Sequence, residues 1–197
     1  MTSFPEVIDS TILATFRSCH QKYYRMYHPG QDWKPQAESV HLVAGAAFAR
    51  GVEVGRLAFY RDGKPAADAV GLGLGALLEA YGDFQCPPES AKSCDRMAGA
   101  LEFYFSQYPL GDDGTKPVFV GDRHGIEFSF VEPLPYSHPV TGNPMLYSGR
   151  ADMIADFAGA PYIFDDKTTS QLGASWTRQW DLRSQFTGYC WAARSNN

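Results

Sequence analysis

Hydrophobic side chains in the first half of the chain recur every three or four residues, which is the spacing of an amphipathic helix. The pattern predicts helices over residues 10–27, 40–60, 66–81 and 90–108. Asp9 and Ser10 precede the first helix and are residue types that favour helix N-caps. Three glycines in the second helix, Gly45, Gly51 and Gly55, suit close packing against a neighbouring helix.

The pattern changes after Pro109, where β-branched and aromatic residues alternate with turn residues. Strands are predicted over residues 118–120, 125–131, 145–157 and 162–166. Helical spacing returns over residues 176–194. This order predicts one α+β domain with a tendency to three layers, in which a mostly antiparallel sheet follows N-terminal helices and precedes a C-terminal helix. The predicted domain covers residues 1–197, with its helical part at about 8–108 and its sheet part at about 115–197.

Composition narrows the class of protein. Hydrophobic residues make up 44% of the 197 residues and aromatic residues 14%, which is enough for a packed core. No stretch has the roughly 18 apolar residues that a membrane span needs, and the start of the chain lacks a signal peptide, so a cytoplasmic protein without membrane contact is expected. The net charge of −5 weighs against a simple coating protein for nucleic acid. A nuclease remains compatible, because it needs only a local basic rim.

Two acidic residues and a lysine are expected to meet on one face of a hairpin. Gly159 and Ala160 suit a two-residue turn of type II′, which has glycine in its first central position. That turn would place Asp152 opposite Lys167, with Asp165 as a diagonal neighbour on the same face.

Asp166 would point to the opposite face, because side chains alternate along a strand. A two-residue slip of the strands would keep this arrangement, whereas a one-residue slip would bring Asp166 in place of Asp165.

A cluster of two carboxylates and a lysine beside apolar strands is costly unless a cation neutralises the acids. Oxygen ligands suit Mg²⁺ or Mn²⁺, which can polarise a phosphodiester and lower the pKa of a bound water. The ammonium group of Lys167 could hold that water or offset charge on the phosphate. The alternative is that Asp152, Asp165 and Lys167 are surface residues joined by an ordinary ion pair.

These features resemble the PD-(D/E)XK nuclease superfamily in its RecB-like and phage exonuclease branch. The matching segments, in chain order, are TILATFRSCHQKYYRMY, GIEFSF, SGRADMIADF, IFDDKTT and RSQFTGY. The resemblance implies a restriction-endonuclease-like core, with Asp152 and Asp165 as metal ligands and Lys167 as the catalytic lysine. It also implies that Glu127 supports the site or binds the metal.

The last motif implies that Gln185 and Tyr189 contact DNA or buttress the site. Arg178 and Arg183, near the same helix, are candidates for phosphate contacts, as are Arg17, Lys22, Arg25 and Arg194. The implied function is a metal-dependent deoxyribonuclease, and an exonuclease by resemblance alone, that hydrolyses phosphodiester bonds in phage or bacterial DNA processing. DNA is the implied partner, and a recombination or replication protein is compatible with this branch.

Several features depart from the family pattern. The helical G-x-x-x-H motif has Ala49 where a histidine ligand is usual. Cys19 matches the first cysteine of an iron–sulfur cluster, but the other three cysteines do not follow the spacing of such a cluster, so no cluster is expected.

The chain also ends soon after Tyr189, where the fold normally adds a strand, which is compatible with truncation. A catalytically inactive relative that binds nucleic acid or protein therefore stays open, as does an unrelated α+β protein.

Overall fold

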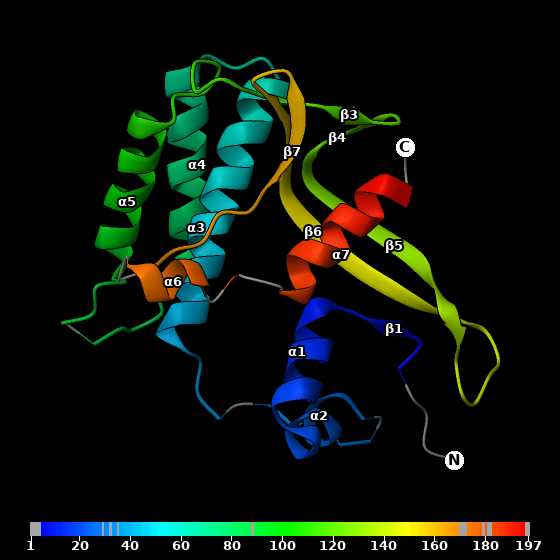
Figure 1. Ribbon diagram of the computed structural model, residues 1–197. Helices are drawn as coiled ribbons and strands as arrows, with labels where there is room; N and C mark the ends of the chain where they lie inside the picture. Colours follow the sequence, from blue (N-terminus) through cyan, green and yellow to red (C-terminus); the bar gives the residue numbers. More distant parts are fainter. Residues whose placement is uncertain are drawn as a thin grey trace. The chain divides into compact units, whose positions relative to one another are not determined.

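The computed structural model of the protein is shown in Figure 1. It describes residues 5–28, 30–31, 33–34, 36–87, 89–169, 173–178, 180 and 183–195. The architecture is α+β, with N-terminal helices, a mixed sheet and a C-terminal helix. The chain forms two compact units that interleave along the sequence. Unit 1 comprises Met1–Gln36, Ser129–Arg150 and Gly173–Asn197, and unit 2 comprises Ala37–Phe128 and Ala151–Leu172.

The helices of unit 2 follow the predicted pattern closely. Helix α3 covers Val40–Arg56 and continues into a π-helical turn, η1, at Leu57–Arg61. Helix α4 covers Ala66–Tyr81, as predicted, and helix α5 covers Cys94–Gln107, four residues later than the predicted start. No helix among the described residues is long and apolar enough to cross a membrane.

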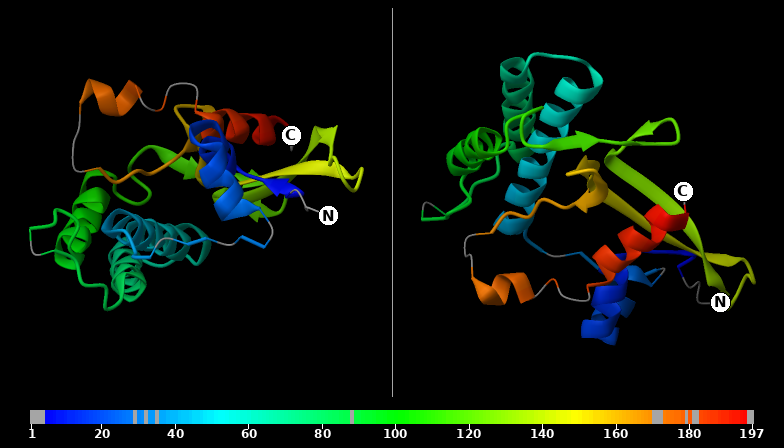
Figure 2. Two further views of the ribbon diagram at one scale, coloured as in Figure 1. Left: turned by 90° about the horizontal axis from the view of Figure 1, so that it is seen from below. Right: turned by 45° about the horizontal axis from the view of Figure 1, so that its top comes forward.

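Helices α3 and α4 lie side by side in both views of Figure 2. A Cβ atom added to Gly73 of α4 would lie 2.6 Å from the carbonyl oxygen of Gly51 on α3. The two backbones therefore touch, and the predicted role of Gly51 in helix packing is confirmed. Large side chains complete this core, which contains Ala44, Ala47, Phe48, Val52, Leu77, Tyr81, Met97, Leu101 and Phe105.

Strand β6 (Pro144–Phe157) is the centre of a five-stranded sheet within the described residues. It pairs antiparallel with β2 (Thr115–Pro117) and β7 (Ala160–Phe164), and it also pairs with β5 (Ile126–Ser137). Strand β1 (Val7–Ile8) pairs parallel to β6, so the sheet is mixed. A separate ribbon joins β3 (Phe119–Val120) to β4 (Arg123–His124).

The β6–β7 turn differs from the predicted turn. Its central residues are Ala158 and Gly159, both with positive φ (54° and 83°), as a type I′ turn requires. Ala158 thus has a left-handed backbone at the first central position, where the predicted turn had Gly159. Met153 therefore pairs with Phe164, a shift of two residues from the predicted register, and β7 ends at Phe164 rather than Asp166.

Two predicted helices of unit 1 are each divided. Residues 10–27 form α1 (Ser10–Ser18) and α2 (His20–Tyr27), because Cys19 adopts an extended backbone between them. The Asp9 carboxylate caps α1 by accepting a 2.7 Å hydrogen bond from the Ile12 amide, as predicted. The predicted C-terminal helix is divided into α6 (Ala174–Arg178) and α7 (Ser184–Ser195), and residues 179, 181 and 182 between them lie outside the described residues.

Aromatic rings form the buried centre of unit 1. Phe130 packs against Tyr147 and Tyr189, with ring centroids 5.9 and 6.0 Å apart. Gly149 and Gly188 leave space for these rings, since a Cβ atom on Gly188 would lie only 2.5 Å from the Tyr147 ring. Helix α7 is held against β6 by this contact and by the Tyr147 hydroxyl, which donates to the Ser184 carbonyl.

Candidate functional site

Asp152 and Asp165 lie where the β6–β7 ladder ends. Met153 and Phe164 are the last paired residues, so Asp152 and Asp165 occupy the next position in the same register. Instead of a backbone bond, the Asp152 carboxylate accepts a 2.7 Å hydrogen bond from the Asp166 amide. The Asp152 carboxylate thus takes the place of a backbone carbonyl as acceptor for the Asp166 amide, and it holds the start of the segment that follows β7.

Lys167 belongs to the same group of charges. Its ammonium group forms an ion pair with the Asp165 carboxylate, whose side chain is almost completely buried. Lys167 also acts electrostatically on Asp152. The structure therefore brings together Asp152, Asp165 and Lys167, as predicted, although the register differs by two residues from the predicted one.

The charges around Asp152 are unevenly balanced. Burial raises the pKa of the Asp152 carboxyl group, and the negative charges of Asp165 and Asp166 raise it further. The hydrogen bond from the Asp166 amide and the charge of Lys167 lower it, but the net shift in pKa is upward. A cation placed beside Asp152 and Asp165 would relieve this repulsion.

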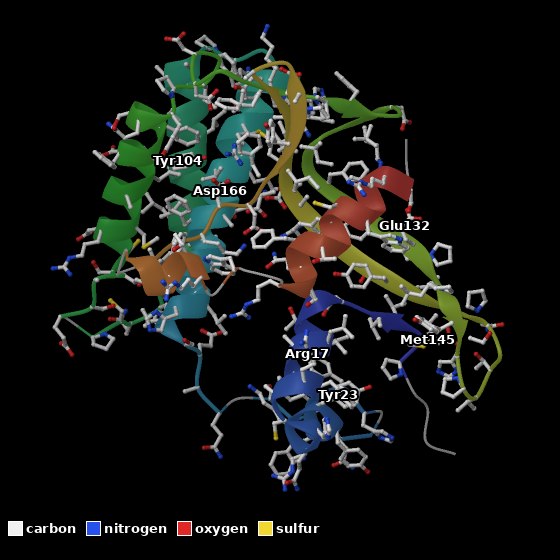
Figure 3. The ribbon with its side chains drawn as sticks, viewed as in Figure 1. Arg17, Tyr23, Tyr104, Glu132, Met145 and Asp166 are labelled. Atoms are coloured by element: carbon white, nitrogen blue, oxygen red, sulfur yellow. The ribbon has the colours of Figure 1, made fainter. Side chains whose placement is uncertain are left out.

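Asp166 directs its side chain to other partners, as strand alternation predicts. Its carboxylate accepts a 2.7 Å bond from the Arg56 guanidinium and a 3.0 Å bond from the Tyr104 hydroxyl. Arg56 also donates to the Tyr104 hydroxyl at 2.6 Å, which closes a triangle of three side chains. Figure 3 labels Tyr104, from α5, and Asp166, from the segment after β7. This triangle fixes the segment that carries Asp165 and Lys167.

Lys92 is a buried cation beside the same segment. Its ammonium group donates to the Thr168 hydroxyl at 3.2 Å, and only 9% of the residue is exposed. Burial lowers the pKa of Lys92. No pattern in the sequence pointed to Lys92, which lies 76 residues before Thr168 and just before α5.

Arg56 and Tyr104 were also missed, although Arg56 had a sequence signal. It continues a four-residue spacing from Ala44, Phe48 and Val52, all of which are buried. A cation in an apolar helical stripe indicates a buried acidic partner.

Glu127, the predicted supporting acid, lies on β5, which pairs with the strand that carries Asp152. It has a left-handed φ of 49°, and its negative charge helps to raise the pKa of Arg50 on α3. Arg50 itself forms a 2.8 Å ion pair with Glu53. Among the described residues, no three His, Cys, Asp or Glu side chains form a set that could hold a metal ion.

The donor set at Asp152 and Asp165 nevertheless fits a magnesium-type cation. Mg²⁺ commonly binds through one or two carboxylates and completes its shell with water and substrate phosphates. Asp152 and Asp165 supply two such carboxylates, and the pKa of Asp152 is raised mainly by burial and further by the charge of Asp165. These two residues would hold the ion.

The predicted pair on the last helix lies in unit 1. Gln185 donates from its amide nitrogen to the Tyr189 hydroxyl at 2.9 Å, so the two residues share one face of α7, as predicted. Tyr189 is buried and packs against Phe130. The Arg183 guanidinium lies 5.7 Å from the Trp180 ring, and Arg178 ends α6 with its side chain exposed.

None of the four cysteines forms a disulfide. Cys19 accepts a hydrogen bond from the Lys22 amide as the N-cap of α2. Cys19 therefore has a local structural role in the first helical hairpin.

The chain matches no protein-family model, and no curated protein or solved structure is significantly similar to it. The resemblance to PD-(D/E)XK nucleases thus rests on the motifs of this sequence.

Proposed function

We propose that the protein is a metal-dependent DNA nuclease of the restriction-endonuclease-like type, acting in phage or bacterial DNA processing. The observation that supports this proposal is the group of Asp152, Asp165 and Lys167 at the end of the β6–β7 ladder. Two neighbouring carboxylates, one of which has a pKa raised by burial and by the charge of the other, supply the oxygen ligands that a divalent cation prefers. Titratable groups with perturbed pKa values cluster at functional sites more often than elsewhere.

Each side chain then has a distinct role. Asp152 and Asp165 would hold Mg²⁺ or Mn²⁺, which when bound would polarise a phosphodiester and lower the pKa of a bound water. Lys167 has donors and no acceptor, so it cannot bind the cation and acts on the attacking water or the phosphate. Arg56, through Asp166, keeps Asp165 and Lys167 in position.

The test is a cleavage assay with Mg²⁺ and with Mn²⁺ on linear and circular DNA, both single- and double-stranded. Lys167→Ala should reduce cleavage at least about 100-fold and leave metal binding largely intact. Asp152→Ala should weaken both, because it removes a ligand. Lys64→Ala is the matched control, because Lys64 is exposed in the loop before α4. This variant should cleave DNA at the wild-type rate. Cleavage of linear but not circular DNA would identify an exonuclease.

A catalytically inactive binding relative is the second candidate. It is favoured by Ala49 at the usual histidine position and by the lack of a three-residue ligand set among the described side chains. DNA binding without cleavage in either metal would support it. Cleavage by Lys167→Ala at the wild-type rate would contradict the proposed mechanism.

A further inference from the structure

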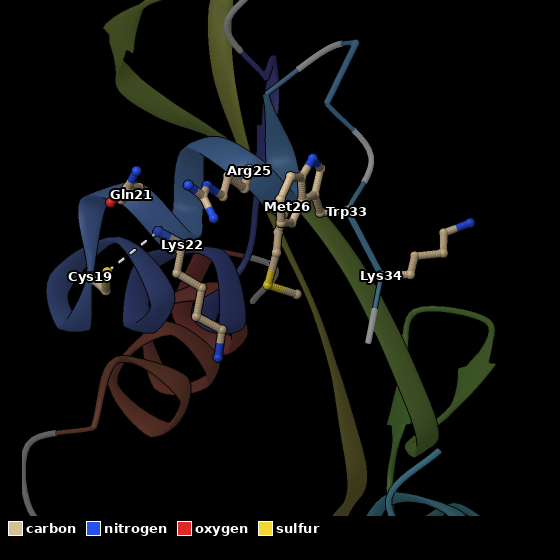
Figure 4. Close-up of a pocket in the computed structure, with 7 residues that line it drawn as sticks. All are labelled: Cys19, Gln21, Lys22, Arg25, Met26, Trp33 and Lys34. Atoms are coloured by element: carbon tan, nitrogen blue, oxygen red, sulfur yellow. Dashed lines mark hydrogen bonds between the residues drawn. The ribbon is translucent and has the colours of Figure 1, made fainter. Parts of the chain in front are cut away.

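A pocket of about 360 Å³ lies on unit 1, around helix α2. Figure 4 shows the side chains that line it, among them the indole of Trp33 and the side chain of Met26. The lining residues are Cys19, Gln21, Lys22, Arg25, Met26, Trp33 and Lys34. The pocket thus combines one large aromatic ring with three cationic side chains.

Trp33 is exposed and at the same time held in place. The residue is 56% exposed, although a Trp side chain is costly to leave in water. Its amide donates to the Arg25 carbonyl at 3.1 Å, which fixes the backbone against α2. The Arg25 guanidinium lies 4.6 Å from the indole centroid and orients the ring through a cation–π contact. A fixed, exposed indole is a surface on which a flat apolar ring can stack.

The charge around this ring differs from that of the whole chain. Residues 10–36 contain four basic residues and one acidic residue, a net charge of +3, whereas the chain carries −5. Lys22, Arg25 and Lys34, three of these four basic residues, line the pocket. The ligand that complements both features has flat bases and phosphates.

We propose that this pocket binds single-stranded nucleic acid. A base stacks on Trp33, and the adjoining phosphates contact Lys22 and Lys34. A single strand fits better than a duplex, because the faces of paired bases are covered by their neighbours in the stack. The site lies in unit 1 and uses none of the residues proposed for catalysis, so it does not depend on the nuclease activity.

The first test measures binding of a fluorescein-labelled 15-residue oligo(dT) by anisotropy, with EDTA present to prevent cleavage. Trp33→Ala should bind about 5- to 150-fold more weakly, the range expected for the loss of one stacked base. Trp33→Phe should retain part of the affinity, because it keeps a smaller aromatic face. Tyr136→Ala is the matched control, because Tyr136 is an aromatic residue that is 67% exposed on β5 and does not line the pocket. This variant should bind oligo(dT) with wild-type affinity.

The second test separates stacking from charge. The slope of log affinity against log salt concentration should fall by about 1.4 in the Lys22→Gln, Lys34→Gln double variant, because each phosphate contact on a single strand contributes about 0.7. Lys64→Gln should leave the slope unchanged. Thermal unfolding of each variant checks that unit 1 is intact, and the charge variants decide the question if Trp33→Ala does not fold.

Wild-type affinity in Trp33→Ala with an unchanged slope in the lysine variant would overturn the proposal. Equal affinity for oligo(dT) and for a blunt duplex of the same length would also overturn it. Binding that depends on Trp33, in a protein that cleaves no DNA with either metal, would support this site and contradict the proposed nuclease.

Discussion

Asp165 and Asp166 are consecutive residues, but their carboxylates have different surroundings. The Asp166 carboxylate accepts hydrogen bonds from the buried Arg56 guanidinium and from the Tyr104 hydroxyl. Asp165 pairs with Lys167 and lies close enough to Asp152 to raise the pKa of that carboxyl group. Asp166 therefore stabilises the segment after β7, whereas Asp165 belongs to a charged cluster with Asp152 and Lys167.

The two aspartates show that a buried carboxylate can act in two ways, as a structural ion pair or as a member of a charged cluster. The ion pair of Asp166 with Arg56 fixes the position of a backbone segment, whereas burial of Asp152 beside Asp165 raises the pKa of Asp152 and so lowers stability at neutral pH. Natural proteins accept such local costs mainly at functional sites. Substitutions on the two sides of this segment should therefore have opposite effects on stability and on metal binding.

The largest effect is expected for Arg56→Ala. The substitution leaves the Asp166 carboxylate without its cationic partner, and only 6% of the Arg56 side chain and 17% of the Asp166 side chain are exposed. The free energy of unfolding should fall by about 3–5 kcal/mol, measured by urea denaturation. Arg50→Ala is the control, because the exposed Arg50–Glu53 pair should contribute at most about 1 kcal/mol. Equal losses in the two variants would contradict the special role of Arg56.

A smaller loss is expected for Tyr104→Phe. The hydroxyl donates to Asp166 and accepts from Arg56, while the ring packs edge-on against Phe48 and remains in the variant. Removing hydrogen bonds to charged groups should cost about 1–3 kcal/mol of unfolding free energy. The raised pKa of Tyr104, caused mainly by burial, keeps the hydroxyl protonated at neutral pH.

Tyr108→Phe provides the control for Tyr104→Phe. Tyr108 follows α5 and its ring lies 5.2 Å from that of Tyr104, but the residue is 55% exposed. Loss of its hydroxyl should change stability little. A comparable loss in both variants would show that the hydroxyl of Tyr104 has no special value.

Asp152→Asn should act in the opposite direction. Folding raises the pKa of Asp152, so the charged carboxylate lowers stability as pH rises above its unfolded pKa, and the neutral amide removes that cost. The amide oxygen can still accept from Asp166, so the metal-free variant should be at least as stable as the wild type at pH 7. Mn²⁺ at ten times its dissociation constant should stabilise the wild type by about 1.4 kcal/mol and the variant much less. Equal stabilisation of both by Mn²⁺ would remove Asp152 from the proposed ligands.

Local sequence patterns predicted the helices and strands better than they predicted the contacts between side chains. Helix α4 matched at both ends, because Pro65 and Gly82 bound a continuous periodic segment. The division of the first helix at Cys19 and the turn at Ala158 were missed, since both depend on backbone conformations that the residue types do not require.

The face of each acid was predictable, whereas its contacts were not. Side chains alternate between the two faces of a strand, so Asp165 and Asp166 were predicted to point to opposite faces. A register shift of two residues leaves each side chain on its predicted face. Arg56 lies 110 residues from Asp166 and Lys92 lies 76 residues from Thr168, so tertiary packing decides both contacts.

The smallest expected effect concerns Lys92, the other buried cation beside this segment. Burial lowers the pKa of Lys92, so the unfolded chain binds more protons than the folded protein between the lowered pKa and the unfolded value. Stability should therefore rise with pH across this alkaline window, because the cost of burying the charge disappears as Lys92 is deprotonated. Lys92→Met fills a similar volume and lacks the titration. The stability of the wild type relative to Lys92→Met should thus increase from about pH 7 to about pH 10, measured by urea denaturation at each pH. A constant difference would show that the ammonium group of Lys92 is as well solvated in the folded protein as in the unfolded chain.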